Sequence, residues 1–160
     1  AATAAWCVQQ WPDFKPQQIY CSALQRAIDS AAVVQEQFAV PIQQDERINE
    51  IYFGEWEGLA FAEVEQELPG ALERWFGDPL NHPAPGGEDF YHLAERVDQF
   101  LASTLQSPCI IVAHYCSIAV IASRLLGVPL SHADRLALHR GSCGRITDGH
   151  LNIWGVPADG

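Results

Sequence analysis

A continuous apolar run in the second half of the chain restricts the fold more than any other feature. Residues 109–113 read CIIVA, and His114 ends the run. A short run of this kind, without polar alternation, is typical of a strand buried on both faces of a parallel sheet. The next segment, SIAVIASRLLG at residues 117–127, has the composition of a helix, and its final glycine is a helix-ending signal. The two segments predict one strand-to-helix unit of an α/β protein.

Strand-like and helix-like segments alternate along the rest of the chain. We expect helices at residues 1–11, 23–38, 61–68, 71–76 and 88–105, and strands at residues 17–21, after Pro41, and at 135–139, 144–148 and 151–155. This alternation predicts an α/β sandwich with a mostly parallel sheet. Neither a repeat nor a linker interrupts the pattern, so a single domain over residues 1–160 is expected.

The net charge of the chain limits the classes of binding partner that it can have. Nine Lys and Arg residues stand against 20 Asp and Glu, which gives a formal net charge of −11. Such an acidic chain is a poor match for nucleic acid or for an anionic membrane surface, and we expect neither as a partner. A small anionic substrate remains compatible, because a local arginine pocket can override the average. Eight of the nine cations are arginines, whose planar fork suits phosphate.

The cysteines and the first residues of the chain indicate the cellular compartment of the protein. Five cysteines is an odd number, and they are scattered along the chain. This pattern favours reduced thiols in a cytoplasmic protein over a secreted disulfide scaffold. The segment AATAAWCVQQ has no basic region before an apolar one, so it does not resemble a signal peptide. The sequence gives no indication of the oligomeric state.

Two strand-to-helix junctions carry candidate ligand-binding residues. In open α/β sheets, ligands bind beyond the carboxyl ends of the strands. Ser22 and Arg26 follow the strand at residues 17–21, and a helix with Ser22 as its N-cap would place both on one face. His114 occupies the corresponding position after the apolar strand. Each residue also has an alternative without a ligand: the arginine can be solvated or ion-paired, and the histidine can be structural.

A third element is an acidic loop, INEIYFGEWEG, with Glu50, Glu55 and Glu57 beside aromatic residues. A carboxyl group against aromatic rings tends to have a raised pKa, which suits an acid–base catalyst. The alternative is an acidic surface loop anchored by its aromatic side chains.

Four elements occur in a defined order: CSALQRA, RINEIYFGEWEG, the stretch from WFGDP to APGGE, and IIVAH. Their order and spacing resemble the histidine phosphatase (phosphoglycerate mutase-like) superfamily, from the first helix to about Gly144. Within it, GEWEG and PGGE resemble most the small phosphatases that include alpha-ribazole phosphatase. The resemblance implies a three-layer α/β/α sandwich with a mostly parallel sheet. It also implies phosphoryl transfer from a small phosphorylated metabolite through a phosphohistidine, without a metal or other cofactor.

The resemblance also implies roles for individual residues. Arg26 matches the arginine of the S-x-L-x-R-A motif and would bind phosphate together with Ser22. Glu50 matches the glutamate of L-N-E-x-x-x-G and would protonate the leaving oxygen. His114 matches the second histidine, which contacts the phosphoryl group and belongs to the catalytic set. Residues 86–88 match the G-G-E element.

The chain departs from the family pattern at two places. The R-H-G-x-T motif, which supplies the nucleophilic histidine, is absent from these residues. It would lie on a first strand, in a segment of roughly thirty residues upstream of Ala1. Tyr115 and Cys116 stand after His114, where the family usually has glycine. A Cβ at Tyr115 would exclude glycine-only backbone conformations and could crowd the phosphate.

Other residues fit a nucleophile poorly. His139-Arg140-Gly141 has the residue types of the motif in a different order, and the remaining histidines lie near loops, turns or a helix face. Cys21 and Arg26 have four residues between them, not the five of a cysteine phosphatase loop. The leading hypothesis is therefore a phosphomonoester hydrolase. Two alternatives remain open: an inactive descendant that binds a phosphorylated ligand or a partner, and a phosphoglycerate mutase-type phosphotransferase.

We predict that the gene product extends upstream of Ala1 and carries the nucleophilic histidine there. Intact-mass measurement on functional material tests this, because the 160 residues alone have a mass of 17.7 kDa. Functional protein of about that mass would contradict the prediction.

Overall fold

A wholly parallel three-stranded sheet forms the centre of the first of two compact units. The computed structural model describes residues 2–104 and 107–155. The first unit comprises Ala1–Glu50 and Arg96–Gly160, and the second comprises Ile51–Glu95. Each unit is described by itself, and the single domain expected over residues 1–160 stays a prediction.

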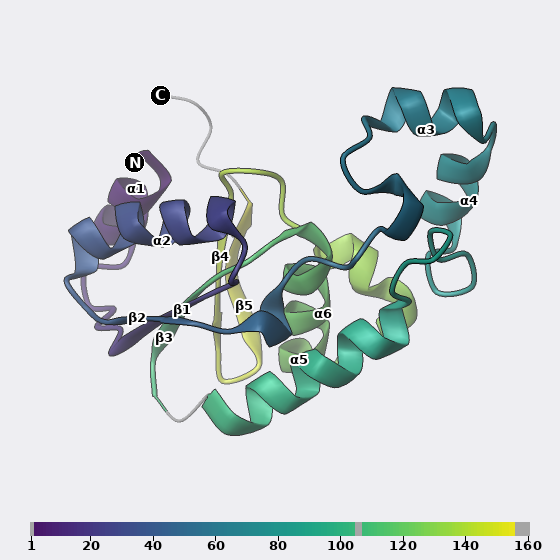
Figure 1. The fold of residues 1–160 in the computed structure, drawn as a ribbon. Coiled ribbons are helices and arrows are strands. Elements are labelled where there is room, and N and C mark those ends of the chain that lie inside the picture. The colour runs from purple at the N-terminus through teal and green to yellow at the C-terminus, as the bar shows by residue number, and fades with distance from the viewer. Residues whose placement is uncertain (1, 105–106, 156–160) are drawn as a thin grey trace. The chain divides into compact units, whose positions relative to one another are not determined.

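The predicted parallel sheet is confirmed. Strand β1 (Gln18–Cys21) lies between β2 (Ile42–Gln44) and β3 (Cys109–Val112), and both pairings are parallel (Figure 1). In register, Ile19 stands opposite Ile42 on one side and Ile110 on the other. The carboxyl ends of all three strands therefore reach the same edge of the sheet.

Helices cover both faces of this sheet. Ile19 and Cys21, which point to one face, are fully buried with Ala31 of α2 (Gln25–Phe38), and α1 (Ala2–Gln10) lies beside α2 (Figure 1). Tyr20 points to the other face, because successive side chains of a strand alternate. Its ring meets Phe100 of α5 (Phe90–Thr104) at 5.4 Å between centroids. Helix, sheet and helix make the three layers that the sequence predicts.

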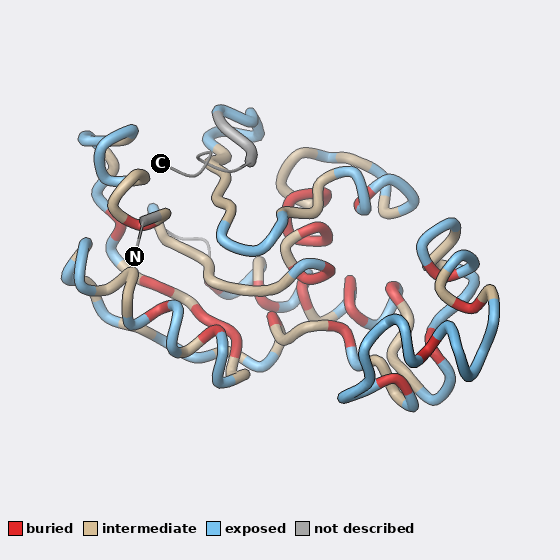
Figure 2. Tube along the Cα trace, turned by 90° about the horizontal axis from the view of Figure 1, so that it is seen from above, coloured by how far each residue is buried: buried red, intermediate tan, exposed pale blue. Residues whose placement is uncertain are grey.

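Helix α6 (Tyr115–Leu126) follows β3 after a two-residue connection and is the most buried helix of this unit (Figure 2). It begins two residues before the expected start and ends at Gly127, whose φ of 68° suits glycine. Within residues 2–104 and 107–155, no single helix is long and apolar enough to cross a membrane. One bent pair, Tyr115–Leu126 with Leu130–Leu136, passes by length and composition only.

The prediction of a strand at residues 135–139 is wrong. Residues Leu130–Leu136 form a 3₁₀ helix, with hydrogen bonds from His132 N–H to Pro129 O and from Ala137 N–H to Asp134 O. These turns use backbone groups that a strand would offer to a neighbour.

The two last predicted strands are confirmed, and they form an antiparallel hairpin. Strands β4 (Cys143–Thr147) and β5 (His150–Gly155) pair with each other. Asp148 and Gly149 connect them with φ values of 52° and 71°. Positive φ at both central residues is what a two-residue hairpin turn requires, and Asp-Gly is a frequent sequence for it.

The second unit is small and mostly irregular. It holds a 3₁₀ turn at Gly54–Trp56 and two short helices, α3 (Phe61–Glu67) and α4 (Ala71–Gly77), which confirm both predicted helices. Trp75 is its central side chain and lies against the rings of Phe53 and Phe90.

Two glycine motifs of this unit pack directly on each other. Glu55 N–H donates to Pro85 O and Glu88 N–H donates to Tyr52 O, at 2.9 and 2.8 Å. A Cβ on Gly54 would lie 2.2 Å from Pro85 O, and Gly54 has a φ of 56°. The GEWEG and PGGE elements therefore need glycine for contact and for conformation.

We predict that Gly54→Ala lowers the free energy of unfolding by about 2 kcal/mol or more, because both backbone strain and steric overlap oppose the added methyl group. Gly77→Ala is the matched control, since nothing lies within 4 Å of a Cβ there. Urea denaturation measures both variants, and equal midpoints for the two would contradict this packing.

Candidate functional site

The candidate site begins where β1 ends. Ser22 directly follows the strand and is fully buried. It is not the N-cap of α2 as predicted, because the helix begins at Gln25 with Leu24 as its N-cap. The hydroxyl of Ser22 instead accepts a hydrogen bond from Leu24 N–H at 3.1 Å and donates to Asn49 Oδ1 at 2.8 Å.

The carboxyl end of β3 brings His114 to the same place. Its Nε2 lies 2.8 Å from Ser22 Oγ, and its Nδ1 lies 3.2 Å from Nε of Arg26. Because a guanidinium only donates, Nδ1 must be the acceptor and the ring proton is on Nε2. His114 Nε2–H therefore donates to Ser22, and the hydroxyl proton of Ser22 points to Asn49.

Asn49 fixes the direction of this chain of hydrogen bonds. Its Oδ1 accepts from Ser22 Oγ and, at 2.9 Å, from the backbone N–H of Ala23. Two donors on one oxygen orient the amide. Asn49 thus connects the loop after β2 to the ends of β1 and β3.

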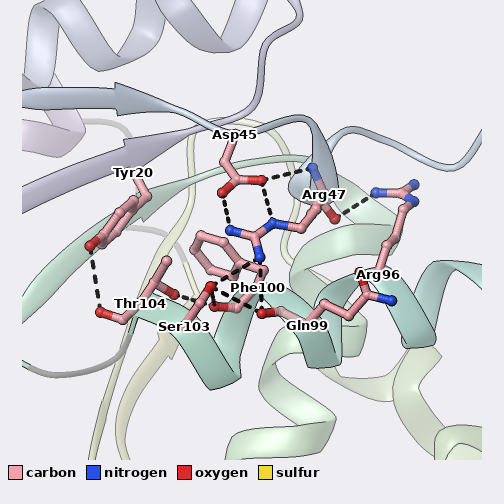
Figure 3. Close-up of polar contacts among 8 residues, drawn as sticks. All are labelled: Tyr20, Asp45, Arg47, Arg96, Gln99, Phe100, Ser103 and Thr104. Carbon is pink, nitrogen blue, oxygen red and sulfur yellow. Dashed lines mark hydrogen bonds and ion pairs between the residues drawn. The ribbon is translucent and has the colours of Figure 1, made fainter.

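The segment that carries Asn49 is held by two arginines (Figure 3). Arg47 binds both oxygens of Asp45, at 2.9 and 2.6 Å, and donates to Gln99 O and Ser103 Oγ of α5. The hydrogen bond from Arg47 lowers the pKa of Asp45, so the pair stays charged.

Arg96 of α5 holds the same segment through its backbone. Its Nη1 donates to the carbonyls of Arg47 and Asn49 at 2.8 Å, and Nη2 donates to Glu50 O at 3.1 Å. A planar fork with several donors can satisfy neighbouring carbonyls in an irregular segment, which a lysine cannot do in one geometry.

Glu50 reaches the start of α6. Its Oε1 accepts backbone N–H groups of Cys116 and Ser117, at 3.0 and 3.3 Å, and Oε2 accepts from Cys116 at 3.3 Å. Free N–H groups at a helix N-terminus favour a carboxylate. The aromatic surroundings expected for Glu50 stay a prediction. In the second unit, Glu57 similarly accepts from the backbone N–H of Phe53.

Tyr115 fits the backbone without strain, contrary to expectation. Among the non-glycine residues that the structure describes, positive φ occurs only at Ala39 and Asp148. Tyr115 is the first residue of α6 and is 40% exposed, whereas Cys116 is buried. The position after His114 therefore does not need glycine in this chain.

The predicted residues come together only in part. Ser22, Arg26, Glu50 and His114 all belong to the first unit, and hydrogen bonds link them through Asn49 and the start of α6. Residues 86–88 belong to the second unit, where they pack on the GEWEG loop. Among the described side chains, no group of three or more His, Cys, Asp or Glu could hold a metal ion.

A comparison with protein families decides the classification. The sequence profile of the family described as "Histidine phosphatase superfamily (branch 1)" matches residues 1–150. The chain belongs to the histidine phosphatase superfamily. The resemblance found in the sequence is thereby confirmed, and so is the fold that it implied.

Several relatives of the chain are named as phosphatases. The chain is 31% identical over 129 residues to glucosyl-3-phosphoglycerate phosphatase of Mycolicibacterium vanbaalenii, covering 74% of this chain and 57% of the relative. It is 28% identical over 115 residues to adenosylcobalamin/alpha-ribazole phosphatase of Escherichia coli, covering 69% of this chain and 57% of the relative. The chain thus spans little more than half the length of these relatives.

A solved structure supports the same classification. Mycobacterial glucosyl-3-phosphoglycerate phosphatase in complex with inorganic phosphate superposes with a TM-score of 0.74 at 25% identity. The match covers 96% of this chain and 83% of the other.

Sequence reasoning missed Asn49 and Arg96. Asn49 precedes Glu50 in the L-N-E-type motif, and that adjacency was the available signal. Arg96 lies in the helix predicted at residues 88–105. The apolar spacing that predicts a helix gives no information about the carbonyls that the Arg96 guanidinium binds.

The charge state of His114 follows from its surroundings. Burial, followed by the positive charges of Arg26 and Arg96, lowers the pKa of His114 to about 4. The imidazole is therefore neutral at neutral pH, in agreement with the proton position deduced from Arg26.

This lowered pKa predicts a pH dependence of stability. The unfolded imidazole titrates near its ordinary pKa of 6.5, but the folded one titrates near 4, so the unfolded state binds more protons between these values. The free energy of unfolding should fall as the pH falls from 6.5 to 4, and the fall should be smaller in His114→Gln. Urea denaturation at several pH values measures it. His82→Gln, at a side chain 47% exposed, is the control, and equal slopes for wild type and His114→Gln would contradict the assignment.

Proposed function

We propose that the protein is a phosphomonoester hydrolase that acts on a small phosphorylated metabolite through a phosphohistidine. The observation that supports this proposal most is the convergence of Arg26, His114 and Glu50 at the carboxyl ends of β1 and β3. An arginine, a neutral histidine and a carboxyl group are the groups that metal-free phosphoryl transfer to a histidine requires.

Arg26 and His114 would bind the phosphoryl group. Among the described residues, the guanidinium of Arg26 has one hydrogen bond, from Nε to His114 Nδ1, and the side chain is exposed. Its Nη groups are then oriented by that bond and can donate in parallel to two phosphate oxygens. The ring of His114 is neutral, and its Nε2–H donates to Ser22 in the structure, so it would contact a phosphoryl oxygen by exchanging that bond. Such donors stabilise the charge on the equatorial oxygens in the transition state.

Ser22 would act indirectly, by positioning His114. Its hydroxyl is buried and occupied by Asn49, Leu24 and His114. A phosphate oxygen would have to replace one of these three partners in order to bind it. We therefore include Ser22 in the proposal as a positioning residue, and the direct phosphate contact predicted for it stays a prediction.

The reaction would proceed in two steps. In the first, an imidazole nitrogen of the nucleophilic histidine forms a bond to phosphorus while the bond between phosphorus and the ester oxygen breaks, and the carboxylic acid of Glu50 protonates the leaving oxygen. In the second, the Glu50 carboxylate takes a proton from water, whose oxygen attacks phosphorus as the P–N bond breaks. Inorganic phosphate leaves, and Glu50 is protonated again.

The nucleophile belongs to the proposal as well. These 160 residues do not contain the R-H-G motif, and a nucleophilic histidine upstream of Ala1 stays a prediction. The substrate class rests on the relatives, whose names specify phosphate esters of small metabolites. The odd number of scattered cysteines supports a cytoplasmic location.

The decisive experiment measures hydrolysis of p-nitrophenyl phosphate by the product of the complete reading frame. We expect Glu50→Gln to reduce kcat by about 10²- to 10⁴-fold, because an amide cannot exchange the proton. Glu55→Gln, a neighbouring glutamate of the second unit, is the matched control and should keep its activity.

Two outcomes would contradict the proposal. The first is full turnover by Glu50→Gln. The second is a folded wild-type protein without turnover whose thermal midpoint rises with inorganic phosphate, which would support an inactive phosphate-binding descendant. Retention of the phosphoryl group on phosphoglycerate, detected by product analysis, would favour a mutase-type phosphotransferase instead.

A further inference from the structure

Three contacts join the segments that carry α1 and β4. Thr3 Oγ1 donates to Gly141 O at 2.6 Å, Cys7 Sγ donates to Cys143 Sγ at 3.2 Å, and Trp11 lies under the guanidinium of Arg145 at 5.9 Å. Thr3 and Cys7 belong to α1, which Trp11 follows, and Cys143 and Arg145 belong to β4, which Gly141 precedes.

Between the other two contacts, two thiols meet. Cys7 and Cys143 are both partly buried, with a contact above and a contact below that hold the elements in line. A disulfide has an S–S distance of about 2.05 Å, so the sulfurs need to approach by roughly 1 Å. Cys21 and Cys116, in contrast, are buried in other parts of the unit.

We propose that Cys7 and Cys143 are a redox-modification site, at which a hydroperoxide converts the two thiols into a reversible disulfide that ties α1 to β4. This inference does not rest on the proposed phosphatase activity, because it involves neither the residues nor the reaction of that site.

The pair is asymmetric, and the asymmetry assigns the roles. The hydrogen bond from Cys7 lowers the pKa of Cys143, and the same bond raises the pKa of Cys7. Cys143 is therefore the thiolate that attacks the peroxide, and Cys7 is the resolving thiol.

The chemistry balances with one peroxide. The Cys143 sulfur attacks one peroxide oxygen, the O–O bond breaks, and the departing hydroxide takes a proton to form water, leaving a sulfenic acid on Cys143. The Cys7 sulfur then attacks the Cys143 sulfur. The S–O bond breaks, the S–S bond forms, and a second water leaves with the proton of Cys7. Two thiols and one hydrogen peroxide thus give one disulfide and two waters, and a dithiol reverses the change.

The test treats the protein with equimolar hydrogen peroxide and counts thiols before and after. We expect the number of titratable thiols to fall by two from the five cysteines of the chain, with a mass loss of about 2 Da and a Cys7–Cys143 linkage in peptide mapping by tandem mass spectrometry. The thermal midpoint should rise by roughly 5–15 °C, because the cross-link closes a long loop, and dithiothreitol should restore the starting value.

Single variants separate this pair from general thiol oxidation. Cys7→Ser and Cys143→Ser should each abolish the linkage and the rise of the midpoint. Cys109→Ser, at another partly buried cysteine, should keep both. Retention of all five thiols in wild type, a linkage between other cysteines, or an unchanged midpoint after linkage would overturn the proposal.

Discussion

The guanidinium of Arg96 donates to three carbonyls within residues 47–50, and the candidate site depends on that anchoring. This segment is neither helix nor strand beyond its short 3₁₀ turn, so its carbonyls have no regular partners. Left unpaired and partly buried, they would cost free energy. Once they are held, the side chains of two consecutive residues diverge: Asn49 reaches the end of β1, and Glu50 reaches the start of α6.

The electrostatics of the site differ from those of the whole chain. The formal net charge is −11, yet Arg26 and Arg96 act on one neutral histidine. The carboxylate of Glu50 is held by the N-terminus of α6. A helix N-terminus is a natural anion site, and here a side chain of the protein fills it. The N–H groups of Cys116 and Ser117 are therefore occupied by Glu50 in the folded chain.

Regular elements were predictable because their signals are local. The apolar run 109–113 predicted β3 and residues 88–105 predicted α5, and both elements are confirmed, although the residues of β3 are half-buried rather than buried on both faces. The predicted start of α2 was wrong. Ser22 is a residue type that often caps helices, but its hydroxyl forms hydrogen bonds with Asn49 and His114 instead. The strand prediction for residues 135–139 was wrong because apolar alternation does not distinguish a strand from a run of tight turns after proline.

The site was predictable in its residues but not in its connections. Arg26, Glu50 and His114 stood at strand ends or in motifs, so their types and positions were informative. The roles of Asn49 and Arg96 come from partners up to 49 residues away, and several of those partners are backbone atoms that no residue type reveals. Tyr115 illustrates the converse, because a residue that looked incompatible occupies an ordinary helical backbone.

The chain of hydrogen bonds from His114 through Ser22 to Asn49 has a consequence for the order of folding. Its contacts join residues separated by 92 and 27 positions, and the bond from Arg26 to His114 spans 88. Such contacts form only after large loops have closed, whereas helices form from neighbouring residues. The imidazole thus receives its final partners only when three distant segments have assembled. Its magnetic resonance signal would report completion of this unit, at a stage when helical content alone is already close to native.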